Sequence, residues 1–427
     1  MPAFRVLDSA KRPMQRLGYL KYLLNRCVIL ETSNLETLGH ELIGAVTRAI
    51  RVPLTPERAE YVQRRLLDDT YRALKSQVTA WRKNSQPETM VPMEVQDVYL
   101  SDPTMPSRTG KLVAEDWRKY PILGVHIGLI RWGTWSPLVR GVALLKLTSS
   151  EELDAFQGYR PAANPFVISH QQGTLLVYCL LENDGDVLKR LIPRLKACQG
   201  QAFNDRQAGD LLPDIFREIA LYLRNRILPI AERNRLELLL KIAENIARQK
   251  NQSYSGGGAR EEAIKVRLEP LVDIGLLTKD DPYKYEYRLT SAACDFFASL
   301  GENGDIGQFL DTGFFTAWAR TFGPSPVSPA TTPDLLWALN RAWQELKSPI
   351  GYAPIVDTAL LGGIYALTER NAVFEVATVR QFLKDWQKEN PNLLRFGVDR
   401  TGAMAHVRIL GDLAPTSVDV APNRSAQ

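Results

Sequence analysis

The sequence predicts a mainly α protein with short β-hairpins, an α+β fold class, and three observations lead to this prediction. Apolar residues recur at helical spacing over most of the 427 residues. Segments that alternate apolar and polar residues, such as 283–289, are short and lie beside turns. Hydrophobic and charged fractions of 45% and 24% are those of an ordinary globular protein. The chain exceeds the roughly 250–300 residues of a single core, so we expect several domains.

The clearest segment begins with a helix from residue 260 and continues through two strands into another helix. One helical face carries the apolar residues Ile264, Leu268, Leu271 and Val272. Gly275 is placed as the C-terminal cap, where a left-handed residue is favoured. Leu276 and Leu277 start a strand, a charged turn follows at 280–282, and a second strand is expected at 283–289. Thr290-Ser291 can cap the closing helix, 292–300.

This segment resembles the recognition-helix-to-wing part of the winged helix-turn-helix superfamily. The resemblance is carried by residues 271–277 (Leu-Val-Asp-Ile-Gly-Leu-Leu) and 287–290 (Tyr-Arg-Leu-Thr), and covers about a tenth of the chain. It implies that helix 234–250 is the first helix of the module. Two features depart from the family pattern: a Gly-rich loop, 251–258, stands where a short second helix is expected, and Pro270 lies inside the third helix.

Two other parts of the chain repeat the same order, which favours tandem winged-helix-like domains joined by helical segments. Residues 127–130 match 274–277, and Leu-Thr-Ser at 147–149 matches 289–291, so we expect a first wing between 127 and 149. Near the C-terminus, two apolar helices, around 358–367 and 379–386, precede the strands 393–396 and 405–410, with a turn at 399–402.

These patterns divide the chain into seven expected segments. They are a basic helical N-terminal segment (1–55), a first winged-helix-like domain (56–158), a helical connector (159–232), a central winged-helix domain (233–322), a Pro-rich linker (323–333), a C-terminal helical or winged-helix-like domain (334–412) and a disordered tail (413–427). Within the connector, a turn at Asn183-Asp184-Gly185 predicts an antiparallel helix pair.

Charge is unevenly distributed, which is compatible with a basic face that meets phosphate. Residues 1–30 carry six basic residues against one acidic residue, and residues 108–146 carry seven against two. The whole chain has a net charge of only +5, so the remainder is acidic. Solvated helix faces balanced by acidic ones elsewhere would give the same distribution.

We therefore expect nucleic-acid contacts from cations and tryptophans on the helix and wings. The candidates are Arg260, Lys265 and Arg267 on the third helix; Lys279, Lys284 and Arg288 on its wing; Arg131, Trp132, Trp135 and Arg140 in the first hairpin; and Arg118 and Lys119 before that hairpin. The tryptophans fit a buried core equally well. Glu261, Glu262 and Glu269 on the same helix oppose phosphate binding.

Motifs for catalysis, metal binding or membrane insertion are missing from the sequence. The four histidines are far apart, the four cysteines have no paired spacing, and there is no Gly-x-x-x-x-Gly-Lys-Ser/Thr or Gly-x-Ser-x-Gly motif. Asp280-Asp281 is placed in a turn rather than at a metal site. We expect a non-enzymatic protein without cofactor or metal, in a reducing, cytoplasmic compartment. No apolar run approaches the ~20 residues that span a bilayer.

Two functional hypotheses follow. In the first, the chain is a non-enzymatic accessory subunit that recruits DNA, mainly double-stranded and through phosphate contacts, to a larger bacterial complex. By analogy, genome maintenance or phage defence uses such subunits. In the second, the chain is a scaffold whose winged helices bind partner subunits rather than DNA. A nuclease with a dispersed active site is a weaker alternative.

Overall fold

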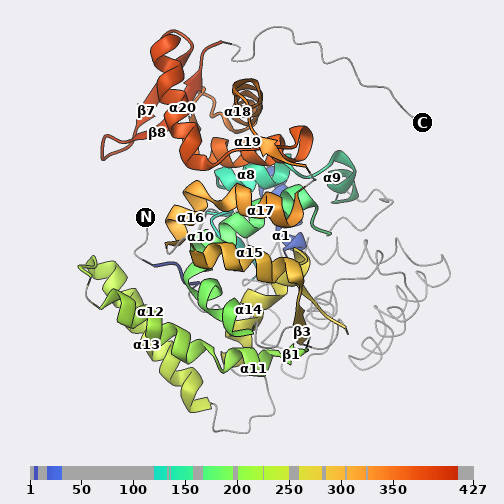
Figure 1. Ribbon diagram of the computed structural model, residues 1–427, viewed down its shortest axis with the longest axis vertical. Helices are drawn as coiled ribbons and strands as arrows, with labels where there is room; N and C mark the ends of the chain where they lie inside the picture. Colours follow the sequence, from blue (N-terminus) through green and yellow to red (C-terminus); the bar gives the residue numbers. More distant parts are fainter. Residues whose placement is uncertain are drawn as a thin grey trace, which may run out of the picture. The chain divides into compact units, whose positions relative to one another are not determined.

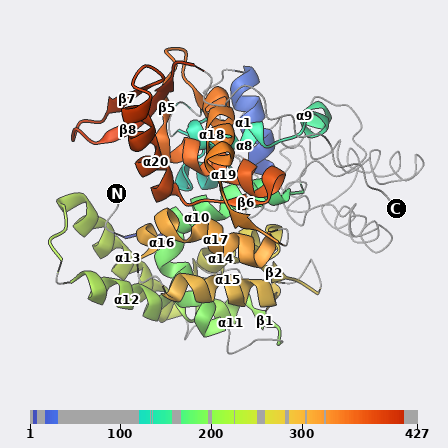
Figure 2. The ribbon, with the colours of Figure 1, turned by 45° about the horizontal axis from the view of Figure 1, so that its top comes forward.

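A computed structural model of the chain describes about two thirds of the residues (Figures 1 and 2). These are 4–7, 17–30, 120–131, 134, 136–156, 167–195, 201–224, 226–249, 259–280, 285–302, 305–323 and 326–411. The expected helix after Thr55-Pro56-Glu57, the connection at 84–110, the loop 251–258 and the tail 413–427 lie outside them. As predicted, the protein is mainly helical with a few short strands. Internal contacts divide the chain into unit 1, Met1–Ile306, and unit 2, Gly307–Gln427.

Helix α1 (Gly18–Leu30) packs on three short helices, α7 (Tyr120–His126), α8 (Val139–Lys146) and α9 (Ser150–Phe156). Its buried Leu20, Leu23 and Leu24 form the apolar face that the helical spacing predicts. The expected long wing between 127 and 149 is wrong. Among the described residues of this stretch, the strand pairing is limited to an antiparallel bridge between Ile130 and Pro137, and α8 occupies residues 139–146. Its residues 139–146 (Val-Arg-Gly-Val-Ala-Leu-Leu-Lys) have no period-2 alternation, and they bury a helical face instead.

The sequence echo between 127–130 and 274–277 is a repeated helix ending. Gly128 and Gly275 have φ of +75° and +82°. In each case the glycine amide donates to the carbonyl three residues before it. The next amide donates to the carbonyl five residues before it, Leu129 to Gly124 at 2.7 Å and Leu276 to Leu271 at 2.9 Å. Both endings are Schellman motifs, in which glycine adopts the left-handed conformation without a Cβ clash. The similarity therefore specifies a helix stop and not a whole domain.

Residues 170–195 form one long helix, α10 (His170–Leu195), and not the helix pair predicted around Asn183-Asp184-Gly185. The three polar or small residues are used by the fold. The Asn183 side chain donates to the Cys179 carbonyl at 2.8 Å, one turn back. A Cβ on Gly185 would lie 2.7 Å from the Ile306 side chain, so glycine serves close packing here rather than a turn.

Unit 1 contains a three-stranded sheet of order β1-β3-β2, formed by β1 (Phe203–Asn204), β2 (Leu277–Thr278) and β3 (Glu286–Leu289). Both strand pairs are antiparallel. Along the chain the order is α10, β1, α11 (Asp205–Gly209), a helical hairpin, α14 (Ala259–Asp273), β2 and β3. We call α10, β1, α11, α14, β2 and β3 the central module. Helix α15 (Ser291–Glu302) follows, capped by Thr290 as predicted, and packs on α10.

The helical hairpin inside the central module consists of α12 (Leu212–Leu223) and α13 (Ile230–Gln249), which lie side by side in Figures 1 and 2. The helix expected at 234–250 is α13, one arm of this hairpin, and the helix that precedes the first strand of the central module is α10. Helix α11 follows β1 and has only five residues. It packs closely on α14, since a Cβ on Gly209 would lie 2.6 Å from Arg260.

Unit 2 has a second three-stranded sheet with the same topology. Helix α18 (Thr332–Leu346) is followed by β5 (Ala353–Pro354), α19 (Ile355–Arg370), α20 (Val376–Glu389), β7 (Leu394–Val398) and β8 (Met404–Ile409). The sheet order is β5-β8-β7, both pairs being antiparallel. We call these elements the C-terminal module. The helix, helix, hairpin order predicted for this part is confirmed, and Thr331 caps α18.

Two short helices and a parallel strand pair complete unit 2. Helix α16 (Ile306–Thr312) begins at the unit boundary and α17 (Phe314–Phe322) follows; β4 (Ser328–Pro329), in the predicted Pro-rich linker, pairs with β6 (Ala372–Val373). The Glu375 carboxylate accepts the Phe315 and Thr316 amides at 3.1 and 2.7 Å. It thus caps the first turn of α17 from the start of α20.

Candidate functional site

Arg260, the first cation predicted to contact phosphate, lies inside unit 1. It is 4% exposed, and its guanidinium binds Asp210 at 2.6 Å and Glu261 at 2.8 Å. Asp210 follows α11, so this pair holds the second helix of the central module against the third. A guanidinium enclosed by two carboxylates and protein is not available to a phosphate in this structure, and we remove Arg260 from the candidate surface.

Arg267 is buried more deeply and has a different role from the one predicted. Its guanidinium lies 2.8 Å from Asp184 of α10 and donates to the carbonyls of Leu7 at 3.0 Å and Ala263 at 2.6 Å. The Leu7 amide donates to the same Asp184 carboxylate at 2.8 Å. The pKa of Asp184 is raised to about 6 because burial disfavours its charge, against the opposing effect of Arg267. These contacts fix segment 4–7 onto α10 and α14.

Lys265 and Lys279 are also neutralised within the central module. Lys265 pairs with Asp205 at 3.2 Å and lies 3.5 Å from the centroid of the Tyr285 ring. Lys279 is 4% exposed at its side chain and pairs with the fully buried Glu269 at 2.8 Å. Glu269, which the sequence presents as a repulsive charge toward phosphate, thus supplies the counter-charge of a buried cation.

The remaining candidates divide into paired, exposed and undescribed residues. Arg288 pairs with Asp280 at 2.7 Å on the surface, and Arg140 forms a two-pronged pair with Glu182 of α10. Arg131 is exposed. Arg118, Lys119, Trp132, Trp135 and Lys284 lie outside the described residues. The structure therefore does not gather the predicted cations into one basic face within the described part of the chain, because four of them are internal counter-ions.

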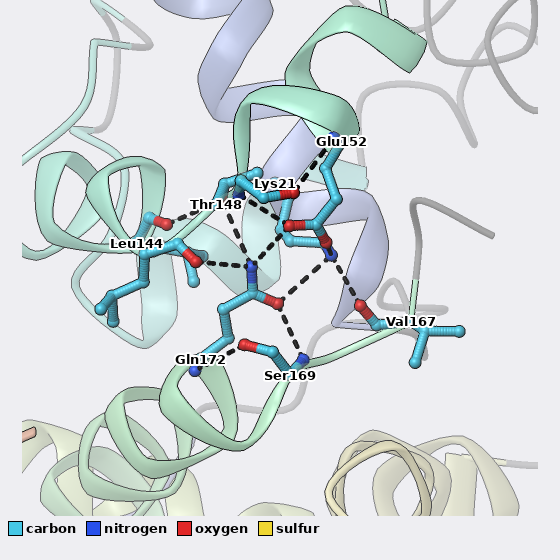
Figure 3. Close-up of polar contacts among 9 residues, drawn as sticks. Lys21, Leu144, Thr148, Glu152, Val167, Ser169 and Gln172 are labelled. Carbon is cyan, nitrogen blue, oxygen red and sulfur yellow. Dashed lines mark hydrogen bonds and ion pairs between the residues drawn. The ribbon is translucent and has the colours of Figure 1, made fainter. Parts of the chain in front are cut away.

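A further buried cation, Lys21 of α1, stands at the centre of a polar network that the sequence did not indicate (Figure 3). Its ammonium group contacts the Glu152 carboxylate and donates to the Val167 carbonyl at 2.7 Å and the Gln172 side-chain oxygen at 3.2 Å. These three acceptors satisfy all three N–H donors of the amine. Burial lowers the pKa of Lys21, and Glu152 opposes that shift.

The rest of this network is a set of helix caps. Ser149 and Glu152 exchange bonds at the start of α9, as the predicted Leu-Thr-Ser helix opening requires, at 2.8 and 3.2 Å. Ser169 and Gln172 do the same at the start of α10, and the Gln172 amide reaches the Leu147 carbonyl at 3.1 Å. Figure 3 shows these side chains converging from α1, α9 and α10. Since the amine is saturated and enclosed, the network holds helices together and offers no reacting group.

The α12–α13 hairpin presents apolar side chains to solvent at its turn. Exposed there, they bury little apolar surface and so contribute little to the stability of the fold. Ile227 is fully exposed, Ile230 is 72% exposed, and Leu221 and Tyr222 are more than half exposed. We call these four residues the hairpin tip. The signal was present in the sequence as Ile-Leu-Pro-Ile, 227–230, an apolar run across a helix break where turns are normally polar. Helical periodicity alone does not reveal this surface, because an apolar residue at helical spacing can lie in a core or at the surface.

Exposed arginines surround the hairpin tip. Arg224, Arg226 and Arg233 are exposed, and none of them forms an ion pair with a carboxylate in the described part of the chain. Arg226 instead lies over the Tyr222 ring, 4.4 Å from its centroid, and the Arg233 side chain donates to the Leu228 carbonyl. The tip is thus an apolar patch with a basic rim.

A small cavity of about 170 Å³ lies beside the base of this tip. Arg5, Lys189, Arg190 and Arg226 line it together with Asp186 and Asp305. Asp186 is already used, since it accepts the Arg5 amide at 2.8 Å and pairs with Arg190. The cavity is smaller than the 300–1,000 Å³ of typical small-molecule sites.

Within the described residues, no group of three or more His, Cys, Asp or Glu side chains is placed to hold a metal ion. Among the described helices, none combines the length and the apolar character needed to cross a bilayer. Comparison with protein-family models, with curated proteins and with solved structures found no match to this chain.

Proposed function

We propose that this protein is a non-enzymatic scaffold subunit built on two winged-helix modules, and that it docks a partner protein through the hairpin tip. The order of elements supports the winged-helix assignment of both modules. In each, a helix, a strand, two helices and two strands follow in that order, apart from β6 between α19 and α20, which belongs to a separate sheet, and the first strand pairs with the last. In the central module the α12–α13 hairpin is an insertion between the second and third helices.

The observation that carries the proposal is the exposure of Ile227, Ile230, Leu221 and Tyr222 on the inserted hairpin. Large apolar side chains grouped on a projecting turn are typical of a surface that is covered by a partner. Tyr and Arg are enriched at the energetic centres of such interfaces. The rim of Arg224, Arg226 and Arg233, which form no ion pair with a carboxylate among the described residues, favours a partner with an apolar centre and an acidic rim.

DNA reading by the central module has less support than docking. Arg260, Arg267 and Lys279 are enclosed with carboxylates, so the third helix and its wing keep few cations for phosphate. A cytoplasmic location and a role in a genome-maintenance or phage-defence complex remain predictions from cysteine usage and analogy.

Site-specific crosslinking in the native cell tests the docking proposal. A photo-reactive amino acid is placed at position 227, and any captured protein is then purified and titrated against the chain. Ile227→Ser with Ile230→Ser should weaken this binding at least tenfold, since truncating residues at the centre of an interface typically has that effect. Ile350→Ser is the matched control, because Ile350 is also 72% exposed and lies in unit 2.

Three results would contradict the proposal. One is the absence of any crosslinked protein that binds again when purified. Another is an equal loss of binding in Ile350→Ser. The third is concentration-dependent self-association of the chain, seen by analytical ultracentrifugation and lost in the Ile227→Ser Ile230→Ser variant, which would identify a second copy as the occupant.

A further inference from the structure

The outward face of the β5-β8-β7 sheet carries a pair of opposed arginines. Arg395 of β7 and Arg408 of β8 are register partners on neighbouring antiparallel strands. Their neighbours on the other face, Leu394 and Ile409, are buried. Because side chains alternate along a strand, both arginines point away from the core of the C-terminal module. Arg395 is exposed and Arg408 is half-buried.

An opposed like-charged pair is unfavourable unless something neutralises it. No carboxylate forms an ion pair with Arg395 or Arg408 among the residues that the structure describes. Asp399, in the turn after β7, is occupied by its own turn, accepting the amides of Thr401 and Ala403 at 2.8 and 3.1 Å. The central module differs, since Arg288 on its last strand pairs with Asp280. Among the described residues, the last strand of the central module thus has a carboxylate beside its arginine, whereas the arginines on the sheet of the C-terminal module have none.

Aromatic and small residues shape the surface around these arginines. Tyr352, just before β5, holds its ring 5.9 Å from the Arg408 guanidinium. A Cβ on Gly397 would lie 3.6 Å from that ring, an ordinary contact, but only 3.2 Å from the Cβ of His406, so glycine here relieves crowding with His406. Gly351 has φ of +84°, and a Cβ there would lie 3.1 Å from the Arg408 Nε. His406 faces the same side, opposite Gly397. We call Tyr352, Arg395, His406 and Arg408 the outer sheet face.

We propose that the outer sheet face binds the phosphodiester backbone of a nucleic acid. Two guanidinium groups on adjacent strands and a neighbouring imidazole offer donors suited to phosphate oxygens. Arg400, an exposed residue in the turn after β7, adds a further cation to this hairpin, and the three residues of strand from Arg395 to Val398 alone span about 10 Å at ~3.3 Å per residue. That span exceeds a single phosphate ion and fits a chain of phosphates. Contacts of this kind position a nucleic acid without selecting its sequence.

This proposal is independent of partner docking at the hairpin tip, which lies in the other unit. It also differs from the phosphate contacts predicted for the third helix of the central module. The cations concerned are in the C-terminal module, on its sheet rather than on its helix.

Fluorescence anisotropy with the full chain and a labelled 20-base-pair duplex tests the proposal, at salt concentrations from 50 to 200 mM. Wild-type protein should bind at low salt, and Arg395→Ala with Arg408→Ala should weaken binding at least tenfold. The slope of log affinity against log salt should also fall by about 0.9 for each lost duplex contact. Arg288→Ala, the arginine with a carboxylate partner on the equivalent strand, is the matched control and should bind as wild type.

The melting temperature of each variant separates a binding effect from unfolding. Removing both members of an opposed like-charged pair should leave the melting temperature unchanged or raised. Absence of wild-type binding at 50 mM salt would overturn the proposal, and so would unchanged duplex binding by the double variant or an equal loss in Arg288→Ala. Vesicles containing anionic phosphatidylglycerol form a parallel arm. Arginine-dependent binding to vesicles but not to the duplex would also overturn it, in favour of a lipid surface.

Discussion

The buried pair of Arg267 and Asp184 should dominate the stability of unit 1. Replacing Arg267 by Met keeps most of the aliphatic volume but leaves the Asp184 carboxylate buried with only the Leu7 amide as a partner. Stranding one member of a buried pair costs about 3–5 kcal/mol. Since a domain is typically stable by only about 5–15 kcal/mol, Arg267→Met should bring unit 1 close to its unfolding threshold.

The double variant distinguishes a charge effect from a packing effect. Asp184→Asn alone strands the Arg267 guanidinium and should also cost about 3–5 kcal/mol. With Asp184→Asn and Arg267→Met together no buried charge remains, and the Asn oxygen still accepts the Leu7 amide. We expect this double variant to lie within about 2 kcal/mol of wild type, the loss reflecting the unfilled Leu7 and Ala263 carbonyls.

The pH dependence of the same pair follows from the raised pKa of Asp184, about 6 against an ordinary value of 3.8. The folded state holds this proton more tightly than the unfolded state. The associated stability is therefore fully present below pH 4 and lost as the pH rises through 6. A difference of about two pKa units corresponds to roughly 3 kcal/mol. Asp184→Asn should remove this slope.

Hydrogen exchange measured by mass spectrometry in increasing urea is the suitable assay, because it follows the units separately. Peptides from α10 and α14 report unit 1, and peptides from α18 and α19 serve as an internal reference. Strictly additive losses in the two single variants and the double variant would refute the reasoning. So would a wild-type unit 1 whose stability is constant between pH 4 and 6.

Two further predictions concern glycines and a helix cap. Gly275→Ala should destabilise unit 1 by about 1–2 kcal/mol because the φ of Gly275 is +82°. Gly301→Ala, at an open position within α15, should instead stabilise unit 1 by about 0.5–1 kcal/mol. Urea denaturation followed by circular dichroism measures both changes, and a change of the same sign in the two variants would contradict these roles of the two glycines. Burial raises the pKa of Glu375 despite its two amide donors, so its contribution to unit 2 should be largest at low pH and lost as the pH rises through that pKa. Glu375→Gln should abolish this trend in thermal unfolding between pH 4 and 7, and a variant with the wild-type pH profile would exclude Glu375 as its source.

Local signals in the sequence were sufficient for much of the fold. Gly275 specifies a helix stop, Thr290 a helix cap, and the alternating segment before Thr290 a hairpin strand, each from neighbouring residues alone. All three are confirmed. The helices α19 and α20 and the hairpin of β7 and β8 were predictable for the same reason, whereas the two-residue strand β5 was not predicted. Turn chemistry and helix caps depend on a few consecutive residues.

Features that depend on distant residues could not be predicted. The two-residue strand β1 and the five-residue helix α11 are too short to show periodicity, so the position of α12 and α13 between α11 and α14 could not be predicted. The positions of the cations were hidden for a similar reason. In the sequence alone, Arg267 looks like an exposed cation. Its partner Asp184 lies 83 residues earlier, and only the fold brings the two side chains together. Composition identifies a charge but not the partner that neutralises it.

The bond from Arg267 to the Leu7 carbonyl spans 260 residues, and this separation bears on how the chain acquires its structure on the ribosome. At about 5–20 residues per second, Leu7 is synthesised roughly 13–50 s before Arg267. Strand β1 likewise precedes its partner β3 by about 80 residues. Segment 4–7, with its apolar Phe4, Val6 and Leu7, therefore lacks its contact with Arg267 in the nascent chain until α14 emerges. The contacts between segment 4–7 and α14 must therefore form late in synthesis. A truncated chain that ends before α14 should associate with chaperones or aggregate.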